Sequence, residues 1–476
     1  MIKEYLNGRR CAILGLGVSN LPLAQYLCKI GQPPLVYDKA DARELGEQAI
    51  ELKKSGAEFF VRSGEFFDID ADVVFRSPGI RPDKISVLRE AELTSEMRLF
   101  LTLTPARTFA VTGSDGKTTS TTLTGRFLQA ECERNGQGRA FVGGNIGTPL
   151  LCDCEQMTKD DLCALELSSF QLMDASCSPT AAAITNISPN HLDWHTGMHE
   201  YISAKKNIVG EGTRRFVTNA ECEQTMEIAR ELSQKDKLQI VLFSSKKQSY
   251  SDIFGDIAPR GGGVAVYVSD GEITVDNGTN KKAVLAVSQI NVPGRHNVEN
   301  FMTAIGLTHG YVSDEVYTLV AKCFYGVEHR LELARKLDGV RYYNSSIDSS
   351  PTRTAAALSA LDGKSIVLIC GGYDKKIPYE PLARAICEHG GVHTVSLTGA
   401  TGERIFDEIE KYRAKTGIGH NIVLNYCKDF KGAVDYAHGA AKKGDCVVLS
   451  PASASFDAFK NFAERGRVFK DIVSQL

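Results

Sequence analysis

The 476-residue chain lacks the features that would direct it to a membrane, a secretory route or nucleic acid. It has no apolar run near the ~18 residues that a transmembrane helix needs, and its first residues, Met1 to Tyr5, carry charge where a signal peptide would be apolar. With 55 basic and 58 acidic residues the net charge is −3, which offers no basic surface for nucleic acid. We therefore expect a cytoplasmic protein without nucleic-acid or membrane partners, and we expect it to be a monomer.

Spacings typical of zinc or redox sites are also missing. The 13 cysteines include no CxxC pair, which fits small buried thiols in a reduced cytoplasm. His191, His195 and His199 repeat every four residues, but no HExxH occurs and Gly197 interrupts a helical pattern. We interpret them as one active-site histidine, His191, and two surface histidines.

The pattern of apolar runs predicts an α/β protein of three domains. Residues 1–103 are predicted to form an N-terminal Rossmann-like domain. Residues 104–325 are predicted to form a central P-loop ATPase-type parallel sheet, with a small β excursion over residues 246–287. Residues 326–476 are predicted to form a C-terminal Rossmann-like domain, with functional residues at the strand ends.

The most informative motif is a glycine turn, Gly113-Ser-Asp-Gly-Lys117-Thr118-Thr119, between an apolar run and a predicted helix over residues 121–130. Glycines let backbone N–H groups face phosphates, the helix N-terminus adds partial positive charge, and lysine reaches the terminal phosphates. A threonine hydroxyl can bind Mg²⁺. The alternative is a chance Gly-Lys-Thr turn, but the strand–loop–helix context favours binding of nucleotide phosphates.

Polar residues at other strand ends add to this prediction. Glu166 closes an apolar run, where a P-loop enzyme places a metal-binding acid, although a helix-cap acid is the alternative. Near the N-terminus, Gly15 and Gly17 follow one predicted strand and Asp38 ends the next, which is the start of a nucleotide-binding βαβ unit. Asn20 stands where a third glycine would be, so this motif is weak for NAD and compatible with another nucleotide.

Seven motifs together indicate a family: GSDGKTT, GGNIG, LELSSFQL, HLDWH, HNxxN, EHRLE and SPASASFDAFKNFAERG. In this order the chain resembles the Mur ligases over essentially its whole length. The last motif is similar to that of the members that add D-glutamate, and no DNPR, expected for members that add diaminopimelate or lysine, occurs. The resemblance implies an ATP-dependent, Mg²⁺-requiring amide ligase that adds D-glutamate to UDP-N-acetylmuramoyl-L-alanine through an acyl phosphate, in peptidoglycan biosynthesis.

The resemblance also implies roles for single residues. The catalytic residues would be Lys117, His191 and Lys205. The metal ligands would be Thr118, Glu166, His191 and Lys205, the last as a carbamate. ATP would contact Gly113, Ser114, Asp115, Gly116, Lys117, Thr118, Thr119, Asn297, Asn300 and Arg330. The UDP substrate would contact Val18, Ser19, Asp38, Lys39, Ser77, Gly79, Asn145, Ser168 and Gln171. D-Glutamate would contact Ser349, Lys375, Ser455, Phe456 and Phe462.

Some positions depart from the family pattern. Asp115 stands where many relatives have asparagine, and Asn190 replaces an acid that some relatives place before the histidine. Ser345 and Ile347 replace an acid that contacts ATP and a lysine. Three alternatives therefore stay open: another ligase of the superfamily, such as a later Mur ligase or a folylpolyglutamate synthetase; a nucleotide-binding oxidoreductase built on the Gly15 turn; and a binding protein without turnover.

Overall fold

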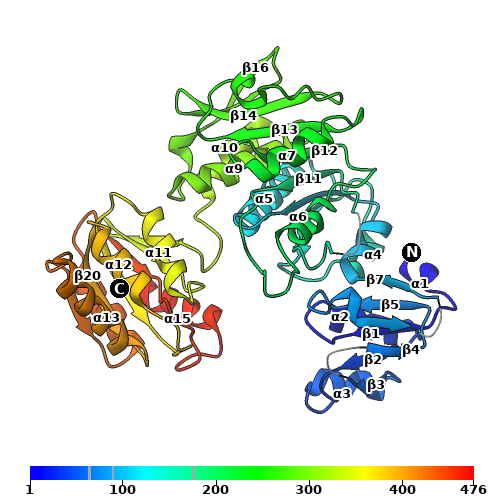
Figure 1. Ribbon diagram of the computed structural model, residues 1–476, viewed down its shortest axis with the longest axis horizontal. Helices are drawn as coiled ribbons and strands as arrows, with labels where there is room; N and C mark the ends of the chain where they lie inside the picture. The colour runs from blue at the N-terminus through cyan, green and yellow to red at the C-terminus, as the bar shows by residue number, and fades with distance from the viewer. Residues whose placement is uncertain (63–65, 88–89, 174–176) are drawn as a thin grey trace. The chain divides into compact units, whose positions relative to one another are not determined.

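The computed structural model describes residues 1–62, 66–87, 90–173 and 177–476 (Figure 1). Contacts divide the chain into two units. The first unit comprises Met1–Gln289 with Val298–Val320, and the second comprises Ile290–Asn297 with Ala321–Leu476. Within the described residues, no helix combines the length and the apolar character needed to cross a bilayer.

The first sheet of unit 1 is parallel throughout, with strand order β3-β2-β1-β5-β7. Its strands are β1 (Cys11–Leu14), β2 (Leu35–Asp38), β3 (Glu58–Val61), β5 (Val73–Arg76) and β7 (Glu92–Thr94). The accompanying elements are α1 (Ile2–Tyr5), α2 (Asn20–Lys29), α3 (Glu47–Lys54), α4 (Glu96–Leu103), and the short strands β4 (Phe66–Ile69) and β6 (Ile85–Val87). Strands β1, β2 and β5 are buried at every residue, which explains why they are apolar up to the terminal Asp38 of β2 and Arg76 of β5.

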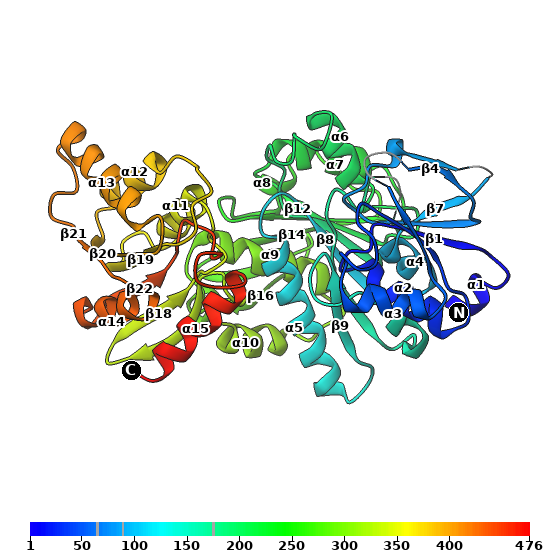
Figure 2. The same cartoon turned by 90° about the horizontal axis from the view of Figure 1, so that it is seen from below.

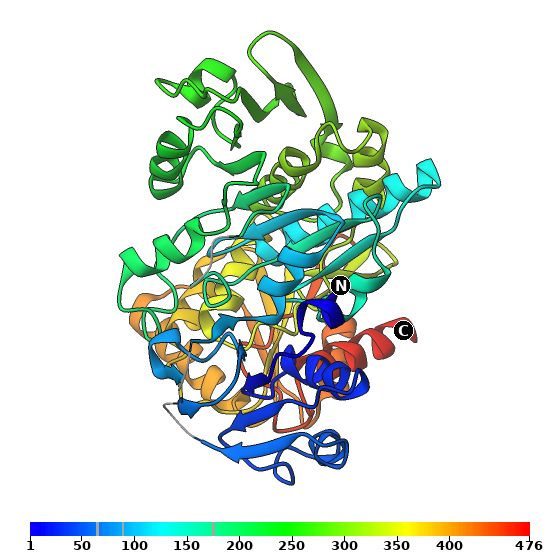
Figure 3. The same cartoon turned by 90° about the vertical axis from the view of Figure 1, so that its right-hand side faces the viewer.

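The second sheet of unit 1 has nine strands in the order β16-β15-β14-β13-β12-β11-β8-β10-β9 (Figure 2). These are β8 (Arg107–Thr112), β9 (Ala140–Gly144), β10 (Leu162–Glu166), β11 (Ala181–Ile184), β12 (Arg215–Asn219), β13 (Gln239–Ser244), β14 (Gly263–Ser269), β15 (Glu272–Asp276) and β16 (Lys281–Ala286). The strands from β9 across to β14 pair in parallel, whereas β14, β15 and β16 pair antiparallel. Figure 3 shows this antiparallel edge, which accounts for the β excursion in the sequence.

Helices accompany this sheet: α5 (Lys117–Asn135), α6 (Met198–Lys206), α7 (Glu223–Leu232), α8 (Tyr250–Phe254), α9 (Arg295–Thr308) and α10 (Asp314–Cys323). Helix α5 is longer than the predicted 121–130. It begins directly after Gly116 and ends directly before Gly136, and both glycines have left-handed backbone. Its first turns are rich in threonine, which has a modest intrinsic helix propensity, so packing against β8, β9 and β10 is needed to stabilise it.

Unit 2 contains a six-stranded sheet in the order β17-β18-β22-β19-β20-β21. Its strands are β17 (Glu332–Leu337), β18 (Val340–Asn344), β19 (Ile366–Gly371), β20 (Val392–Thr398), β21 (Val423–Tyr426) and β22 (Cys446–Leu449). Its helices are α11 (Pro351–Ala360), α12 (Glu380–Glu388), α13 (Gly402–Thr416), α14 (Phe430–Ala440) and α15 (Phe462–Ser474). Alternate residues of β19 enter two separate cores, one with α11, α12 and α13 and the other with α14 and α15. The predicted α/β class with parallel sheets is therefore confirmed.

Candidate active site

The loop between β8 and α5 has the backbone that a phosphate-binding loop needs. Gly113 has φ 144° and Gly116 has φ 78°, conformations that residues with a Cβ rarely adopt. A Cβ on Gly113 would lie 1.9 Å from Thr185 Oγ1, and one on Gly116 would lie 2.5 Å from Asn300 Oδ1. Both glycines are therefore required by conformation and by space, and the loop delivers the N-terminus of α5 at the carboxyl end of β8.

The segment after β11 fastens this loop from the other side. Asn186 Oδ1 accepts a hydrogen bond from Asp115 N at 3.0 Å, and Thr185 Oγ1 donates to Asp115 O at 2.5 Å. Ser114 Oγ donates to Ser188 O at 3.0 Å and lies 2.9 Å from Tyr201 Oη. The loop is thus shaped by tertiary contacts as well as by its glycines.

Two lysines meet the backbone of this loop. Lys117 Nζ donates to the carbonyls of Gly113 and Ser114 at 2.9 and 2.8 Å. Lys205, on α6, is 1% exposed and donates to Gly113 O at 2.8 Å, and its Nζ lies 4.5 Å from the centre of the Tyr201 ring. Burial, with the nearby charge of Lys117, holds the pKa of Lys205 well below its ordinary value. A lysine on a helix ordinarily lies on an exposed face, but Lys205 does not, and its lowered pKa favours an uncharged amine.

Glu166 closes β10 and is 1% exposed. Its Oε1 accepts from Asn145 Nδ2 at 2.8 Å, while its buried Oε2 has no hydrogen-bond partner among the described residues. A buried carboxylate oxygen without a partner is costly unless a cation or donor reaches it. Two side chains whose types suit Mg²⁺ or its surroundings, Glu166 and Lys205, thus lie buried beside the glycine loop, and a third, Asn145, is exposed and contacts Glu166.

His191 follows β11 by a short polar segment and has φ 55°. Its ring packs edge-on against Phe170, with ring centres 5.0 Å apart. Burial together with the charges of Lys117 and Lys205 lowers the pKa of His191, so the structure brings this histidine near both lysines. Among the described residues, no three His, Cys, Asp or Glu side chains gather into a metal-binding group of their own.

The prediction that His195 is a surface residue is wrong. His195 is 3% exposed, and its ring nitrogens lie 3.1 Å from Glu200 Oε2 and 2.9 Å from Ser169 Oγ. His199 is exposed as predicted. The four-residue repeat gave no sign of this difference, because His195 precedes α6 in an irregular segment and is not part of a helical face.

Three loops of the first sheet converge at its carboxyl edge. The Asp38 carboxylate accepts from Leu16 N at 2.7 Å, and a Cβ on Gly15 would lie 3.0 Å from Ser77 Cβ. Val18 is 82% exposed, which leaves an apolar surface beside these loops. Asn20, which stands where a third glycine would be, closes the turn, because its buried Nδ2 donates to Leu14 O and Gly15 O. The predicted contacts Val18, Asp38 and Ser77 therefore lie on neighbouring loops.

In unit 2, four of the residues predicted to contact D-glutamate lie on loops at the strand ends, and the fifth, Phe462, begins α15. Ser349 follows β18, the exposed Lys375 follows β19, and Ser455 and Phe456 follow β22. Phe456 is 63% exposed and packs edge-on against Tyr373 at 5.9 Å. The predicted ATP contacts are divided between the two units: Asn300 lies in unit 1, with Oδ1 3.2 Å from Ser120 Oγ, whereas Asn297 and Arg330 lie in unit 2.

Arg465 is a residue of this region that the sequence did not single out. It is 2% exposed and donates to Ser346 O at 2.9 Å, to Ser453 O at 3.1 Å and to Ala454 O at 3.0 Å. Burial lowers its pKa to about 10. Arg465 therefore holds together the loops that carry Ser349 and Ser455. In the sequence, the one feature that indicated a role for Arg465 is its position inside the C-terminal motif.

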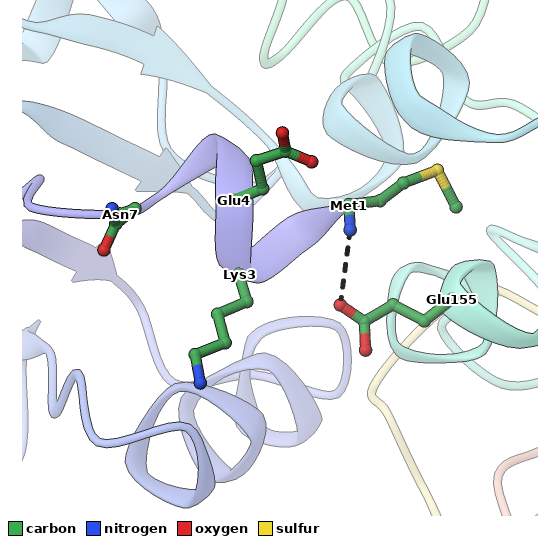
Figure 4. Close-up of a pocket in the computed structure, with 5 residues that line it drawn as sticks. All are labelled: Met1, Lys3, Glu4, Asn7 and Glu155. Atoms are coloured by element: carbon green, nitrogen blue, oxygen red, sulfur yellow. Dashed lines mark ion pairs between the residues drawn. The ribbon is translucent and has the colours of Figure 1, made fainter.

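A surface pocket elsewhere in unit 1 involves none of the predicted residues. It has a volume of about 680 Å³ and is lined by Met1, Lys3, Glu4, Asn7 and Glu155. Figure 4 shows the ion pair across it, in which the terminal amine of Met1 lies 3.9 Å from Glu155 Oε1. Nothing in its lining resembles the phosphate-binding loop.

The chain is similar to known proteins over its whole length. A family model described as Mur ligase middle domain matches residues 111–308, and one described as Mur ligase, glutamate ligase domain, matches residues 329–453. The chain is 41% identical over 489 residues to the UDP-N-acetylmuramoylalanine--D-glutamate ligase of Ruminiclostridium cellulolyticum, covering 100% of this chain and 98% of that protein. It is 39% identical over 481 residues to the ligase of the same name from Clostridium perfringens, with the same coverage.

Solved structures show the same fold at low sequence identity. The UDP-N-acetylmuramate-alanine ligase MurC from Thermotoga maritima aligns with a TM-score of 0.55 and 17% identity, covering 98% of this chain and 99% of that chain. MurF from Acinetobacter baumannii aligns with a TM-score of 0.57 and 15% identity, covering 95% and 98%. At such identities the likeness concerns the fold alone.

Proposed function

We propose, from the premise that the chain belongs to the Mur ligase family, that it joins D-glutamate to UDP-N-acetylmuramoyl-L-alanine with consumption of ATP. The observation that carries this proposal is the match, over the full length of the chain, to ligases named for that reaction. The nine-stranded sheet with its phosphate-binding loop supports the use of ATP. The reaction belongs to peptidoglycan biosynthesis, and its products are the extended peptide, ADP and phosphate. We place it in the cytoplasm.

The three larger sheets correspond to the three domains of the proposal, with boundaries near residues 103 and 325. The N-terminal sheet holds the uridine nucleotide on the loops of Val18, Ser19, Asp38, Lys39, Ser77 and Gly79. The central sheet holds ATP and, through Asn145, Ser168 and Gln171, the muramoyl-alanine end of the substrate. The C-terminal sheet holds D-glutamate, with Lys375 pairing one of its carboxylates.

The first chemical step transfers the γ-phosphoryl group of ATP to the substrate carboxylate. Such transfer depends on positioning and charge neutralisation more than on covalent help from the protein. Lys117 and the N-terminus of α5 neutralise charge on the phosphates. The amine of D-glutamate then attacks the acyl carbon, and the tetrahedral intermediate expels phosphate and leaves an amide.

The residues around the loop fit Mg²⁺. The fit rests on the buried Oε2 of Glu166, which has no hydrogen-bond partner among the described residues, and on the oxygen-rich donor set. Thr118, Glu166 and His191 would hold it, and the bound ion would neutralise charge on the transferring phosphoryl group. The lowered pKa of His191 favours its neutral ring, whose unprotonated nitrogen has the lone pair that a metal ligand needs.

A carbamylated Lys205 would supply a further ligand. The nitrogen of its uncharged amine adds to the carbon of CO₂ and loses one proton, which converts the amine into a carboxylate-like anion. The depressed pKa of Lys205 favours the neutral amine that this addition needs. Its 2.8 Å hydrogen bond to Gly113 O places the amine at the phosphate-binding loop.

The decisive experiment is phosphate release from Mg-ATP and UDP-N-acetylmuramoyl-L-alanine against D-glutamate, L-glutamate, L-lysine and diaminopimelate. Release that requires D-glutamate supports the proposal. Release with another amino acid moves the protein to a different ligase of the same superfamily. No release with any of them refutes the ligase proposal and leaves a binding protein.

A further inference from the structure

A chain of four polar side chains joins the first sheet of unit 1 to the nine-stranded sheet. Arg81, in the loop after β5, donates to Glu200 Oε1 at 3.1 Å and Oε2 at 3.2 Å. Glu200, in the first turn of α6, lies 3.1 Å from His195 Nδ1, and His195 Nε2 lies 2.9 Å from Ser169 Oγ. The chain thus reaches from the loop that carries Ser77 and Gly79 to the segment between Ser168 and Gln171.

The charges in this chain fix the direction of each hydrogen bond. The Arg81 guanidinium, with the backbone N–H of Thr196, lowers the pKa of Glu200 to about 2, so Glu200 is an anion and only accepts. Nδ1 of His195 therefore carries the proton that faces this anion. Burial lowers the pKa of His195, which favours the neutral ring, in which Nε2 accepts the Ser169 hydroxyl proton.

Two further contacts tie the same two regions together. Arg76 donates to Phe170 O at 3.1 Å and to Ile80 O at 2.8 Å, and Trp194 Nε1 donates to Gly79 O at 3.3 Å. The backbone of residues 77–80 is therefore held against Phe170 and Trp194. A displacement of this loop would therefore shift the Ser168–Gln171 segment. The geometry of that segment is set by a hydrogen bond that Ser168 N donates to Gln171 Oε1 at 2.9 Å.

We infer that His195 is a positioning residue, which fixes the Ser169 hydroxyl and through Glu200 and Arg81 locks the Ser168–Gln171 segment to the loop that holds the uridine nucleotide. The expected effect of His195 on turnover rests on the proposed function. Its effect on the order of the Ser168–Gln171 segment rests on geometry alone. One end of the substrate would bind the 77–79 loop and the other end Ser168 and Gln171. Their spacing then decides how the acyl end meets the phosphate-binding loop.

The Ser169–His195–Glu200 arrangement resembles that of a hydrolase, but its surroundings point to positioning. Ser169 is 3% exposed and the His195 side chain is 0% exposed, so a substrate carbonyl has no access to the hydroxyl. The histidine ring is also packed on three sides, by Phe170, Trp194 and Tyr201. Such packing fixes orientation, which is what a positioning residue requires.

The test separates the two hydrogen bonds of the ring. His195→Gln keeps an acceptor near the Nε2 position, and His195→Asn keeps a donor near the Nδ1 position, so only the first retains the bond to Ser169. Ser169→Ala removes that bond from the other side. His199→Gln is the matched control, since His199 is exposed and lies only four residues away.

Steady-state kinetics provide the first readout. We expect His195→Asn and Ser169→Ala each to lower kcat/KM for the UDP substrate by about tenfold or more. His195→Gln should stay closer to the parent protein, and KM for ATP should change little. The Ser169→Ala/His195→Asn double variant should lose no more than the worse single variant, because both changes remove one interaction.

Hydrogen exchange of residues 166–173 provides the second readout and needs no turnover. We expect faster exchange of this segment in His195→Asn and Ser169→Ala, and no change in His199→Gln. If the parent protein releases no phosphate with any amino acid, the proposed function fails, and exchange alone decides this inference. Unchanged exchange and unchanged kinetics in His195→Asn would overturn it. A loss of melting temperature with kcat/KM and exchange preserved would also overturn it and show a purely structural role.

Discussion

Glu96 offers the sharpest test of the electrostatics, because a carboxyl group is buried where only backbone donors reach it. It is the first residue of α4, is 4% exposed, and its Oε1 accepts from Leu151 N at 2.8 Å. Burial raises its pKa from 4.5 to about 7, against the opposing effect of the Leu151 and Leu150 N–H groups. The folded protein therefore binds a proton that the unfolded chain has already released.

The sign of the effect follows from this difference in proton binding. A carboxyl group with a raised folded pKa costs stability as pH rises from about 4.5 to about 7, and the full cost is present above pH 7. At ~1.4 kcal/mol per pKa unit the gap corresponds to ~3 kcal/mol. Glu96→Gln removes the ionisable group but keeps an oxygen that accepts from Leu151 N.

We expect Glu96→Gln to stabilise the protein at pH 8 by up to ~3 kcal/mol and to have little effect at pH 5. The measurement is urea and thermal unfolding of both proteins at pH 5, 6.5 and 8, followed by a probe specific to unit 1, the fluorescence of Trp194. Glu51→Gln is the control, because its side chain is 73% exposed. An equal effect of Glu96→Gln at pH 5 and pH 8, or destabilisation at pH 8, would refute the argument.

Four further predictions concern the candidate active site. Lys117→Ala should lower phosphate release by ~10³-fold or more, through lost charge stabilisation, and near-normal turnover would contradict the role of the loop. Lys205→Ala should be inactive in the same assay and partly restored by acetate, whereas a fully active variant would remove the carbamate from the mechanism. Gly116→Ala should weaken ATP binding measured by calorimetry by at least ~10-fold, because its Cβ would lie 2.5 Å from Asn300 Oδ1 at φ 78°; unchanged affinity would show that the loop adapts. Trp194, the only tryptophan, should change fluorescence when UDP-N-acetylmuramoyl-L-alanine binds, since its Nε1 donates to Gly79 O, and a silent titration at saturation would place the nucleotide elsewhere.

Much of the fold follows from local sequence, because its strands are short apolar runs that end in glycine or polar residues. The strand predicted before Gly15 is β1, which ends at Leu14, and the strand predicted to end at Asp38 is β2, which does end there. The order of the strands within a sheet is different, since it depends on contacts between distant segments. In the nine-stranded sheet, β8 lies between β10 and β11, and no feature of residues 107–112 alone indicates this.

The candidate site shows the same division. The phosphate-binding role of the glycine turn and Lys117 can be predicted from the sequence, because the residues that form the loop are consecutive. The burial of His195 and of Arg465 cannot be predicted in this way, because each contacts a partner far along the chain. The partner of His195 is Ser169, and that of Arg465 is Ser346. Charged or polar residues are ordinarily exposed, so sequence reasoning favours the surface unless a partner is known.

The departures from the family pattern become understandable when their surroundings are considered. Asp115 places an acid in the phosphate-binding loop, but its side chain is exposed and lies 3.5 Å from Ser188 Oγ, while its backbone carries the loop contacts. Solvent screening therefore limits the repulsion between this carboxylate and phosphates. Ser345 is buried, and its Oγ accepts from Leu331 N at 3.1 Å.

An acid is nevertheless present beside Ser345. Asp348 is 7% exposed, and its Oδ2 accepts from Ser450 Oγ at 2.8 Å. Burial raises its pKa, while the hydroxyls of Ser345 and Ser450 and the charges of Arg330 and Arg353 oppose the rise. The turn after β18 thus retains a carboxyl group three residues from the substituted position, at the carboxyl edge of the sheet. A loss of the acid at 345 therefore does not leave this edge without a carboxyl group, which argues against the binding protein without turnover and for an active ligase.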